Sequence, residues 1–469
     1  MRSRFVNLRI PAGKNNTRRA ELVVEGEHFV AIDSASEPDA GASDPAEERI
    51  DLRGALVLPG VIDGHVHFDD PGFTHRENFE TGTRAAAAGG VSCIVDMPCT
   101  SLPPITSGAS LHNKLGVISP KAHVDFMLWG GVCANSMEKP DWRDDLAEIA
   151  QEGVGSVKVY MLSGMDTFRD LGADEIRQVL RETERLGVPV GVHAEDRELV
   201  HELTDWLQQN GQNSLLDYAA SRPAEAEINA VTTMRDLCRE TGGRVHIVHV
   251  GTGRALDVIA EAKSDGLPMS GETCPHFLEF IAEDFDRHGA SLKTAPVVKS
   301  ATDRKRLWEG VVSGELDYVA TDHAAGQWPE EKQTGNAWTD YGGIPGVELM
   351  LPYLHTAGVK EGRFTLERLT EITASAPARF FGIEQRKGRL AAGFDADFVV
   401  FDDAETWTVQ AEDLHNLNRY TPHEGQTMTG RVRSLYVRGQ RAFHRRSDGG
   451  ENFAAPGTGE WVKRQSRVA

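Results

Sequence analysis

The chain has 469 residues, of which 40% are hydrophobic and 26% are charged, the proportions of an ordinary globular protein. Its formal net charge of −21 disfavours a nucleic-acid partner, because phosphates are neutralised by clustered Lys and Arg side chains. No apolar run reaches the roughly 18 residues that a bilayer span requires, so we expect no membrane partner. The length favours one large domain with a smaller one.

The amino-terminal segment and the cysteines favour a cytoplasmic protein. Residues 1–14 carry charges throughout and lack the apolar core and cleavage site of a secretory signal. The five cysteines form no Cys-x-x-Cys pair, which indicates reduced thiols rather than a disulfide framework or a thiolate zinc site.

Both ends of the chain are predicted to form short β-strands. Residues 5–32 contain apolar stretches broken by Gly and charges, residues 33–48 resemble a polar loop, and residues 55–62 form an apolar strand. Residues 388–401 and 432–443 again predict strands with Gly turns. We expect a small β domain assembled from residues 1–58 and 388–445, with residues 446–469 as a carboxyl-terminal tail.

The middle of the chain, residues 59–387, alternates apolar β-rich runs with amphipathic helices such as residues 77–88, 173–186 and 225–240. Such alternation predicts βα units with a parallel sheet. Together with the strand before His65, the candidate strands make eight, the number that closes an α/β barrel. The further candidates are residues 91–97, 124–129, 156–161, 189–193, 244–250, 269–273 and 318–320.

Polar, metal-competent residues recur at the carboxyl ends of the predicted strands, the catalytic face of a barrel. The sequence Asp-Gly-His-Val-His at residues 63–67 places two imidazoles two positions apart, so that both can hold one ion. Taken singly, His193 or His249 is more often a hydrogen-bonded core residue than a ligand, and a His-x-His pair also occurs by chance. As a set ordered on successive strands they predict a metal centre, whose members are His65, His67, Lys158, His193, His249 and Asp322.

A buried ammonium at Lys158 would be costly, but a carboxylated amine becomes an anion that can bridge two divalent cations. Two such cations would lower the pKa of bound water and polarise a carbonyl group. Asp322 would then take the proton from water and deliver it to the leaving nitrogen. This chemistry predicts hydrolysis of an amide.

At these residues the chain resembles the cyclic amidohydrolases of the amidohydrolase superfamily, which comprise allantoinase, dihydroorotase and hydantoinase or dihydropyrimidinase. The match extends from Leu-Pro-Gly-Val-Ile-Asp-Gly-His-Val-His at residues 58–67 to Gly-Phe-Asp-Ala-Asp-Phe-Val-Val at residues 393–400. The resemblance implies an α/β fold of the TIM-type (β/α)8 barrel class with a composite β-sandwich, a binuclear, usually zinc, centre and a dimer or tetramer. It also implies that His65, His67 and Asp322 hold one ion, that His193 and His249 hold the other, and that N6-carboxylated Lys158 bridges them.

Residues that would face the substrate distinguish the members of this group. Dihydroorotases place an Arg and an Asn, which hold the substrate carboxylate, where this chain has Asp69 and Cys99; an Asp there would repel that carboxylate. Hydantoinases place a Tyr that supports the oxyanion where this chain has Ser163. Ala295 and Gly342 correspond to residues that meet the amide edge of the substrate mainly through backbone groups.

The match is closest to allantoinases, which share Asp-Asp-Pro-Gly at residues 69–72, Phe-Glu-Thr-Gly-Thr at residues 79–83, Ala-Ala-Ser-Arg-Pro at residues 219–223 and Gly-Gly-Ile at residues 342–344. The chain departs from their pattern at residues 76–78, 97–101 and 294–299. We therefore expect hydrolysis of a small cyclic ureide such as allantoin. The alternatives are a hydantoinase/dihydropyrimidinase-like or dihydroorotase-like activity and, remotely, a non-catalytic scaffold, which the six intact ligand positions disfavour.

Some neighbouring residues have two interpretations. Cys99 would line the pocket or pack beneath the first loop, and His276 would tune the site or serve a structural role. His323 is expected to pack on the other face of its strand. Residues 326–341 form a long loop that would either close over the substrate or remain a passive surface loop.

Overall fold

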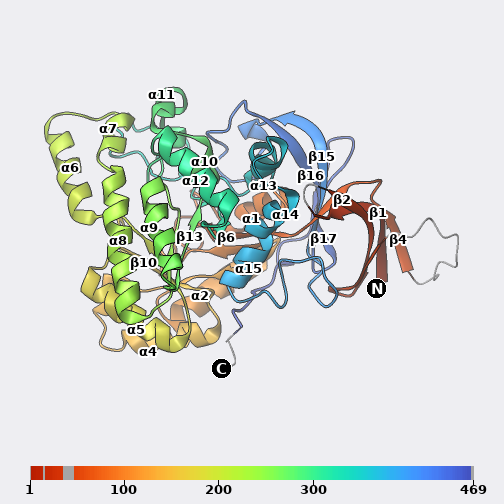
Figure 1. The fold of residues 1–469 in the computed structure, drawn as a ribbon, viewed down its shortest axis with the longest axis horizontal. Helices are drawn as coiled ribbons and strands as arrows, with labels where there is room; N and C mark the ends of the chain where they lie inside the picture. The colour runs from red at the N-terminus through yellow and green to blue at the C-terminus, as the bar shows by residue number, and fades with distance from the viewer. Residues whose placement is uncertain (1, 14–15, 35–46, 466–469) are drawn as a thin grey trace.

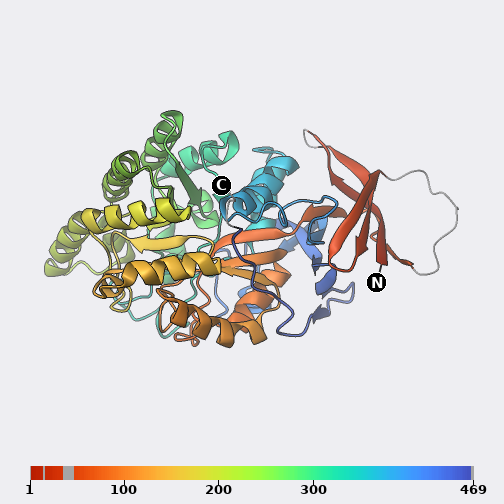
Figure 2. The same cartoon turned by 90° about the horizontal axis from the view of Figure 1, so that it is seen from below.

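The computed structural model describes residues 2–13, 16–34 and 47–465, which form an α/β barrel and a β-sheet domain beside it (Figure 1). Figure 2 shows both parts from below, with the first strands (red) at the end of the molecule away from the barrel helices. None of the described helices combines the length and apolar character needed to cross a membrane.

The barrel consists of two parallel arcs, ordered β6-β7-β8 and β14-β13-β12-β11-β10-β9. A parallel bridge between Val66 and His323 joins β6 to the end of β14, and the His67 amide donates to the His323 carbonyl at 2.7 Å. All seven strands predicted after His65 are confirmed. The barrel segments are β6 Val61–Val66, β7 Val91–Asp96, β8 Asp125–Leu128, β9 Gly130–Gly131, β10 Val157–Tyr160, β11 Val190–His193, β12 Val245–Ile247, β13 Met269–Thr273 and β14 Tyr318–Val319. Segments β8 and β9 are separated only by Trp129 and form one barrel strand, so that the strands number eight.

Amphipathic helices alternate with these strands, as the apolar spacing predicts. Helix α5, for example, buries Ile176, Val179 and Leu180 on one face and ends at Gly187, whose φ of 70° is the left-handed conformation that terminates helices. The α-helices are α1 Phe79–Ala88, α2 Gly108–Ile118, α3 Ala134–Met137, α4 Trp142–Glu152, α5 Ala173–Leu186, α6 Arg197–Gln209, α7 Leu215–Ala220, α8 Ala224–Thr241, α9 Gly253–Ser264, α10 Pro275–Glu279, α11 Phe285–His288, α12 Ala301–Ser313, α13 Met350–Leu354, α14 Leu366–Thr370 and α15 Ala376–Phe380.

The two ends of the chain meet in a nine-stranded sheet ordered β18-β17-β16-β15-β5-β1-β2-β3, with β4 paired to β1. Strand β5 pairs antiparallel with β15, which joins the amino-terminal and carboxyl-terminal halves. The rings of Phe398 and Tyr436 stack 4.5 Å apart in its core. Its strands are β1 Arg2–Pro11, β2 Thr17–Glu25, β3 His28–Ser34, β4 Glu47–Asp51, β5 Leu56–Pro59, β15 Phe398–Thr408, β16 Thr427–Val437, β17 Gln440–Arg445 and β18 Glu451–Phe453.

Several predicted elements differ from the structure in detail. Residues 55–62 form two strands, because the chain leaves the sheet domain after β5 and enters the barrel as β6, with Gly60 between them. Gly60 is packed so closely that a Cβ there would lie 2.2 Å from Ser92 Oγ. In residues 388–401 the strand begins only at Phe398, and residues 432–443 are divided by a turn at Gly439. The predicted tail adds β18 to the sheet, while residues 35–46 of the predicted loop and 466–469 lie outside the described residues.

A buried charge cluster ties the two parts together. Lys387 Nζ lies 2.7 Å from Asp125 Oδ2 on β8, 2.6 Å from Asp397 Oδ2 and 2.9 Å from Asp395 Oδ2 beside β15. Burial lowers the pKa of Lys387, but the three carboxylates together raise it well above its ordinary value. The ammonium therefore takes the place that a cation would otherwise fill among these acids.

We predict that Lys387→Met destabilises the fold by about 3–5 kcal/mol, because it removes the ammonium that three buried carboxylates share, although Asp395 and Asp125 keep an Arg partner. Urea unfolding followed by fluorescence measures this loss. The exposed Lys305, which forms only a 4.0 Å surface pair with Glu309, provides the control, and Lys305→Met should change stability by less than about 0.5 kcal/mol. Equal stability of the two variants would contradict the assigned role of the cluster.

Candidate active site

The first group of predicted ligands meets at the carboxyl ends of β6 and β14. His65 Nε2 lies 3.1 Å and His67 Nε2 lies 3.2 Å from Asp322 Oδ1. All three side chains are buried, and their ligand atoms lie within 4.8 Å of one another. Two imidazole nitrogens and a carboxylate oxygen directed at one point are a donor set typical of zinc and related divalent ions.

The second group lies beside the first. His193 Nδ1, at the end of β11, lies 3.0 Å from His249 Nε2, beyond the end of β12, and the His249 ring centroid lies 5.5 Å from that of His65. Burial lowers the pKa of both His193 and His249. Near neutral pH both imidazoles are therefore uncharged and offer lone pairs to a cation.

Lys158 on β10 is fully buried, and its Nζ has no hydrogen-bond partner among the described residues. It lies 4.8 Å from the centroid of the Tyr160 ring, which stacks on His193. Burial lowers the pKa of Lys158. A buried amine without a hydrogen-bond partner is costly unless something else in the site compensates for it. Its position near the imidazoles fits a site that binds cations and in which the amine is modified.

The backbone is strained where it presents two of these side chains. Asp322 has a φ of 49° and His249 a φ of 42°, a region that side-chain-bearing residues rarely occupy. Buried Asp63 accepts a hydrogen bond from the Thr321 amide at 3.0 Å and from the His65 amide at 3.3 Å. Asp63 thus connects the loop that carries Asp322 to the strand that carries His65.

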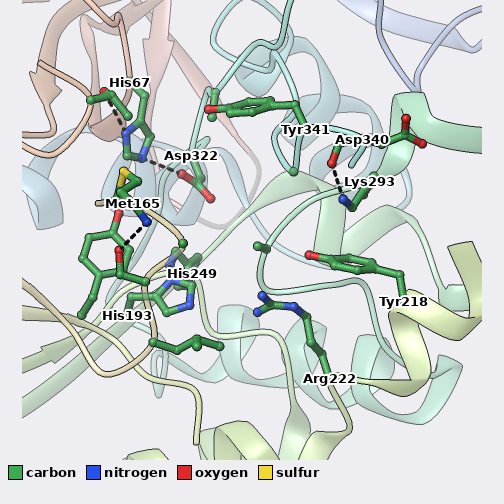
Figure 3. Close-up of a pocket in the computed structure, with 18 of the residues that line it drawn as sticks. His67, Met165, His193, Tyr218, Arg222, His249, Lys293, Asp322, Asp340 and Tyr341 are labelled. Carbon is green, nitrogen blue, oxygen red and sulfur yellow. Dashed lines mark hydrogen bonds and ion pairs between the residues drawn. The ribbon is translucent and has the colours of Figure 1, made fainter. Parts of the chain in front are cut away.

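Five of the six predicted ligands, all except Lys158, line a cavity of about 440 Å³, within the range of small-molecule sites. Figure 3 shows His67, Asp322, His193 and His249 on one side of it, with Tyr218, Arg222 and Lys293 facing them. The lining residues with polar or aromatic side chains, apart from the ligands, are Thr100, Tyr160, Ser163, Tyr218, Arg222, Lys293, Trp338, Thr339, Asp340 and Tyr341.

The predicted substrate contacts divide into two pairs. Ala295 and Gly342 line the cavity beside each other, whereas Asp69 and Cys99 are fully buried and are not among its lining residues. Cys99 Sγ lies 3.7 Å from His67 Nδ1 and 3.2 Å from Tyr160 Oη, so it packs behind them. Burial raises the pKa of Asp69 to about 8, so the expected repulsion of a substrate carboxylate by Asp69 is not supported.

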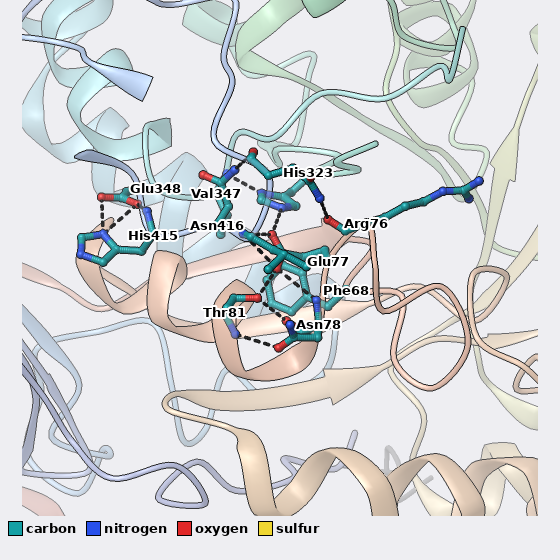
Figure 4. Close-up of polar contacts among 12 residues, drawn as sticks. Phe68, Arg76, Glu77, Asn78, Thr81, His323, Val347, Glu348, His415 and Asn416 are labelled. Atoms are coloured by element: carbon teal, nitrogen blue, oxygen red, sulfur yellow. Dashed lines mark hydrogen bonds and ion pairs between the residues drawn. The ribbon is translucent and has the colours of Figure 1, made fainter. Parts of the chain in front are cut away.

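Three other residues singled out in the sequence have identifiable places. His323 is buried, its Nδ1 accepts from the amides of Gly346 and Val347, and its Nε2 lies 3.4 Å from Glu77 Oε2, which agrees with a structural role (Figure 4). His276 is buried in α10 outside the main cavity, and burial lowers its pKa to about 4. Ser163 lines the cavity but donates to the Phe168 carbonyl at 2.7 Å.

Residues 338–341 of the predicted loop contribute to the cavity wall. Arg76 fixes this loop, because its guanidinium pairs with Glu331 and lies 4.3 Å over the Tyr341 ring. The loop is therefore part of the cavity wall in this structure, and Arg76 contacts the loop from outside the cavity.

Sequence reasoning gave no role to Tyr160, Tyr218, Arg222 and Lys293, which all line the cavity. Arg222 belongs to the Ala-Ala-Ser-Arg-Pro motif, so the sequence marked this residue, but the motif did not indicate what its side chain does. Tyr160 stands two positions after Lys158, and alternation along β10 could have placed both on one face.

Comparison with known proteins shows the family to which the chain belongs. The Amidohydrolase family matches residues 56–442. An allantoinase of Rubrobacter xylanophilus is 38% identical over 421 residues, which cover 90% of each chain, and an allantoinase of Deinococcus radiodurans is 36% identical over 427 residues, which cover 91% and 92%. The solved L-hydantoinase (dihydropyrimidinase) from Arthrobacter aurescens superposes with a TM-score of 0.91 at 30% identity and covers 98% and 99% of the two chains.

A (β/α)8 barrel with an adjoining β-sandwich domain and a histidine-rich cavity at its carboxyl-end face defines a hydrolase of the metal-dependent barrel class. The chain belongs to the Amidohydrolase family, and it is an enzyme.

We predict that removal of metal by a chelator lowers the midpoint of thermal unfolding and that added Zn²⁺ restores it. A cation present at 1,000 times its Kd adds about 4 kcal/mol to stability, because it binds the folded state only. His67→Ala and His249→Ala each remove a predicted ligand and should reduce the response. His276→Ala, which removes a buried histidine outside the ligand set, should keep it; equal midpoints with and without chelator would contradict the metal centre.

Proposed function

We propose that the protein is an allantoinase, which opens the ring of allantoin by hydrolysis of a cyclic C–N bond to give allantoate. The observation that carries the reaction class is the convergence of His65, His67, His193, His249 and Asp322 on one cavity beside buried Lys158. The likeness to relatives named allantoinase over nine-tenths of the chain supports the choice of substrate.

In this proposal His65, His67 and Asp322 hold one divalent cation, His193 and His249 hold the second, and Lys158 lies between the two groups. Zinc is the first choice, because it accepts imidazole and carboxylate ligands. When bound, the cations supply Lewis acidity, which polarises the amide carbonyl and lowers the pKa of water in the site.

Asp322 acts as the general base and then as the general acid. Burial opposes its ionisation, but His65 and His67 hold the pKa of the Asp322 carboxyl below its ordinary value, so it is a carboxylate at neutral pH. It takes the proton from the attacking water and delivers it to the ring nitrogen as the C–N bond breaks. Its strained backbone fixes the carboxylate in position for both transfers.

Lys158 is the residue that we propose to be N6-carboxylated. Its lowered pKa increases the fraction of Lys158 that is a neutral amine. The lone pair of this amine forms an N–C bond to carbon dioxide, and one proton is released. The product is an anion, which removes the cost of burying an ammonium among imidazoles. Such a carboxylate would offer oxygen ligands to cations held by the neighbouring histidines.

The side of the cavity opposite the ligands favours a polar substituent on the ring. Arg222 pairs with Glu195 and Lys293 donates to the Asp340 carbonyl, but each retains further N–H groups, and both lie beside the Tyr218 ring. A ureido substituent can accept from these groups, whereas an apolar substituent would desolvate them without compensation.

A hydantoinase-type activity is the second candidate, and the observation that favours it is the structural match to an L-hydantoinase. Both activities hydrolyse a cyclic amide and would use the same ligands. The substituent on the ring therefore discriminates between them.

We predict that a panel of allantoin, hydantoin, dihydrouracil and dihydroorotate, followed by loss of ring absorbance, gives the highest kcat/KM for allantoin. Asp322→Asn should lower kcat by about 10²–10⁴-fold, because it removes the acid–base group. Lys293→Met should raise the KM for allantoin more than that for unsubstituted hydantoin. Preference for hydantoin would support the second candidate, and hydrolysis of dihydroorotate alone would contradict the proposal.

We also predict that Lys158→Ala loses activity and that short carboxylic acids restore part of it, because they can occupy the place of the proposed carbamate. Lys293→Ala in the same assay is the control, since Lys293 lines the cavity but is not a proposed ligand. Carboxylic acids should leave Lys293→Ala unchanged. Retained activity in Lys158→Ala, or no response to the acids, would count against carboxylation.

A further inference from the structure

Two fully buried carboxylates contact predicted ligand histidines from behind. Glu272 on β13 places Oε1 2.6 Å from His65 Nδ1. Glu195, two residues after His193, places Oε2 2.8 Å from His193 Nε2. One carboxylate thus contacts a histidine of each ligand group.

In both pairs the carboxylate contacts the nitrogen that points away from the other ligands. The opposite nitrogen of His65, Nε2, lies 3.1 Å from Asp322 Oδ1, and the opposite nitrogen of His193, Nδ1, lies 3.0 Å from His249 Nε2. A carboxylate accepts only from a protonated nitrogen, so each contact selects the tautomer whose lone pair is directed into the site. A negatively charged acceptor also makes the imidazole a stronger ligand.

Each carboxylate is held in turn by its own partner. His246 Nε2 lies 3.2 Å from Glu272 Oε2, and His246 Nδ1 lies 2.8 Å from Ser270 Oγ, so His246 can donate to Glu272 while it accepts from Ser270. Arg222 forms an ion pair with Glu195 Oε2. These partners restrain both carboxylates before any cation enters.

We propose that Glu272 and Glu195 are positioning residues that fix the tautomer and orientation of His65 and His193, one for each cation, and thereby set how firmly each cation is held. This inference rests on the proposed metal centre but is independent of which cyclic amide is the substrate. Glu195 also connects the cations to Arg222, so the wall of the cavity and the metal centre share one residue.

The experiment measures release of cobalt from the Co²⁺-loaded enzyme to a chromogenic chelator, together with the visible absorption of bound cobalt. Glu272→Gln should release one of the two ions about 10–100-fold faster, Glu195→Gln the other, and the double variant both. The cobalt spectrum should change in each variant, because the ligand field depends on the hydrogen bond behind the imidazole.

Glu348→Gln is the matched control. Glu348 forms a similar carboxylate–imidazole contact, with Oε1 3.0 Å from His415 Nδ1, but His415 is not a predicted ligand (Figure 4). The Glu348→Gln variant should leave the cobalt release rates and the cobalt spectrum unchanged. Circular dichroism establishes that each variant is folded, and if Glu272→Gln does not fold, His246→Gln weakens the same contact without touching His65 and should accelerate release by a smaller factor.

Release rates and spectra in Glu272→Gln and Glu195→Gln that equal those of the unsubstituted enzyme and of Glu348→Gln would overturn the inference. Failure of the unsubstituted enzyme to bind cobalt would overturn the metal centre as well. Loss of allantoin as a substrate would affect neither measurement, so the two proposals fail separately.

Discussion

Four imidazoles, one amine and one carboxylate are buried together at the carboxyl end of the barrel, and the structure depends on how their charges are compensated. Asp322 is the only carboxylate among the six proposed ligands, and it lies within hydrogen-bond distance of both His65 and His67. Such a cluster is stabilised when cations occupy the points on which the ligand lone pairs converge.

The parallel barrel brings these groups together, because the carboxyl ends of all its strands lie on one face. The pairing of β10 with β11 places Tyr160 opposite His193, with Lys158 two residues earlier on the same strand. Around this face, buried acids restrain groups that strand pairing does not. Asp63 accepts from the Thr321 amide just before Asp322, and Glu272 contacts the His65 side chain from behind. Precision thus comes from hydrogen bonds added to a rigid scaffold.

The parallel barrel and the placement of the six proposed ligands on one of its faces follow from features visible in sequence. Strands at regular spacing with a polar residue at their ends predict one shared face, and the structure places all six residues there. Asp69 was expected to face the substrate because it stands where dihydroorotases place an Arg, but β6 ends at Val66, Asp69 has a φ of 48°, and its side chain is fully buried. Its buried position could not be predicted from spacing.

Glu272 and Arg222 show a second limit of sequence reasoning. Each contacts a residue far away in the chain, Glu272 contacting His65 and Arg222 contacting Glu195, and no local period connects them. A carboxylate inside a predicted barrel strand is nevertheless a signal, since burial without a partner is costly. The substrate-facing wall is equally non-local, because Tyr218, Lys293 and Tyr341 come from three separate segments.

The most direct test of the metal centre is a crystal structure of the metal-loaded enzyme with anomalous data collected at the absorption edge of the bound metal. Two anomalous peaks are expected, one between His65, His67 and Asp322 and one between His193 and His249, with density continuous from Lys158 Nζ toward both. A single peak, or no peak in the cavity under conditions in which the enzyme is active, would contradict a binuclear centre at these residues.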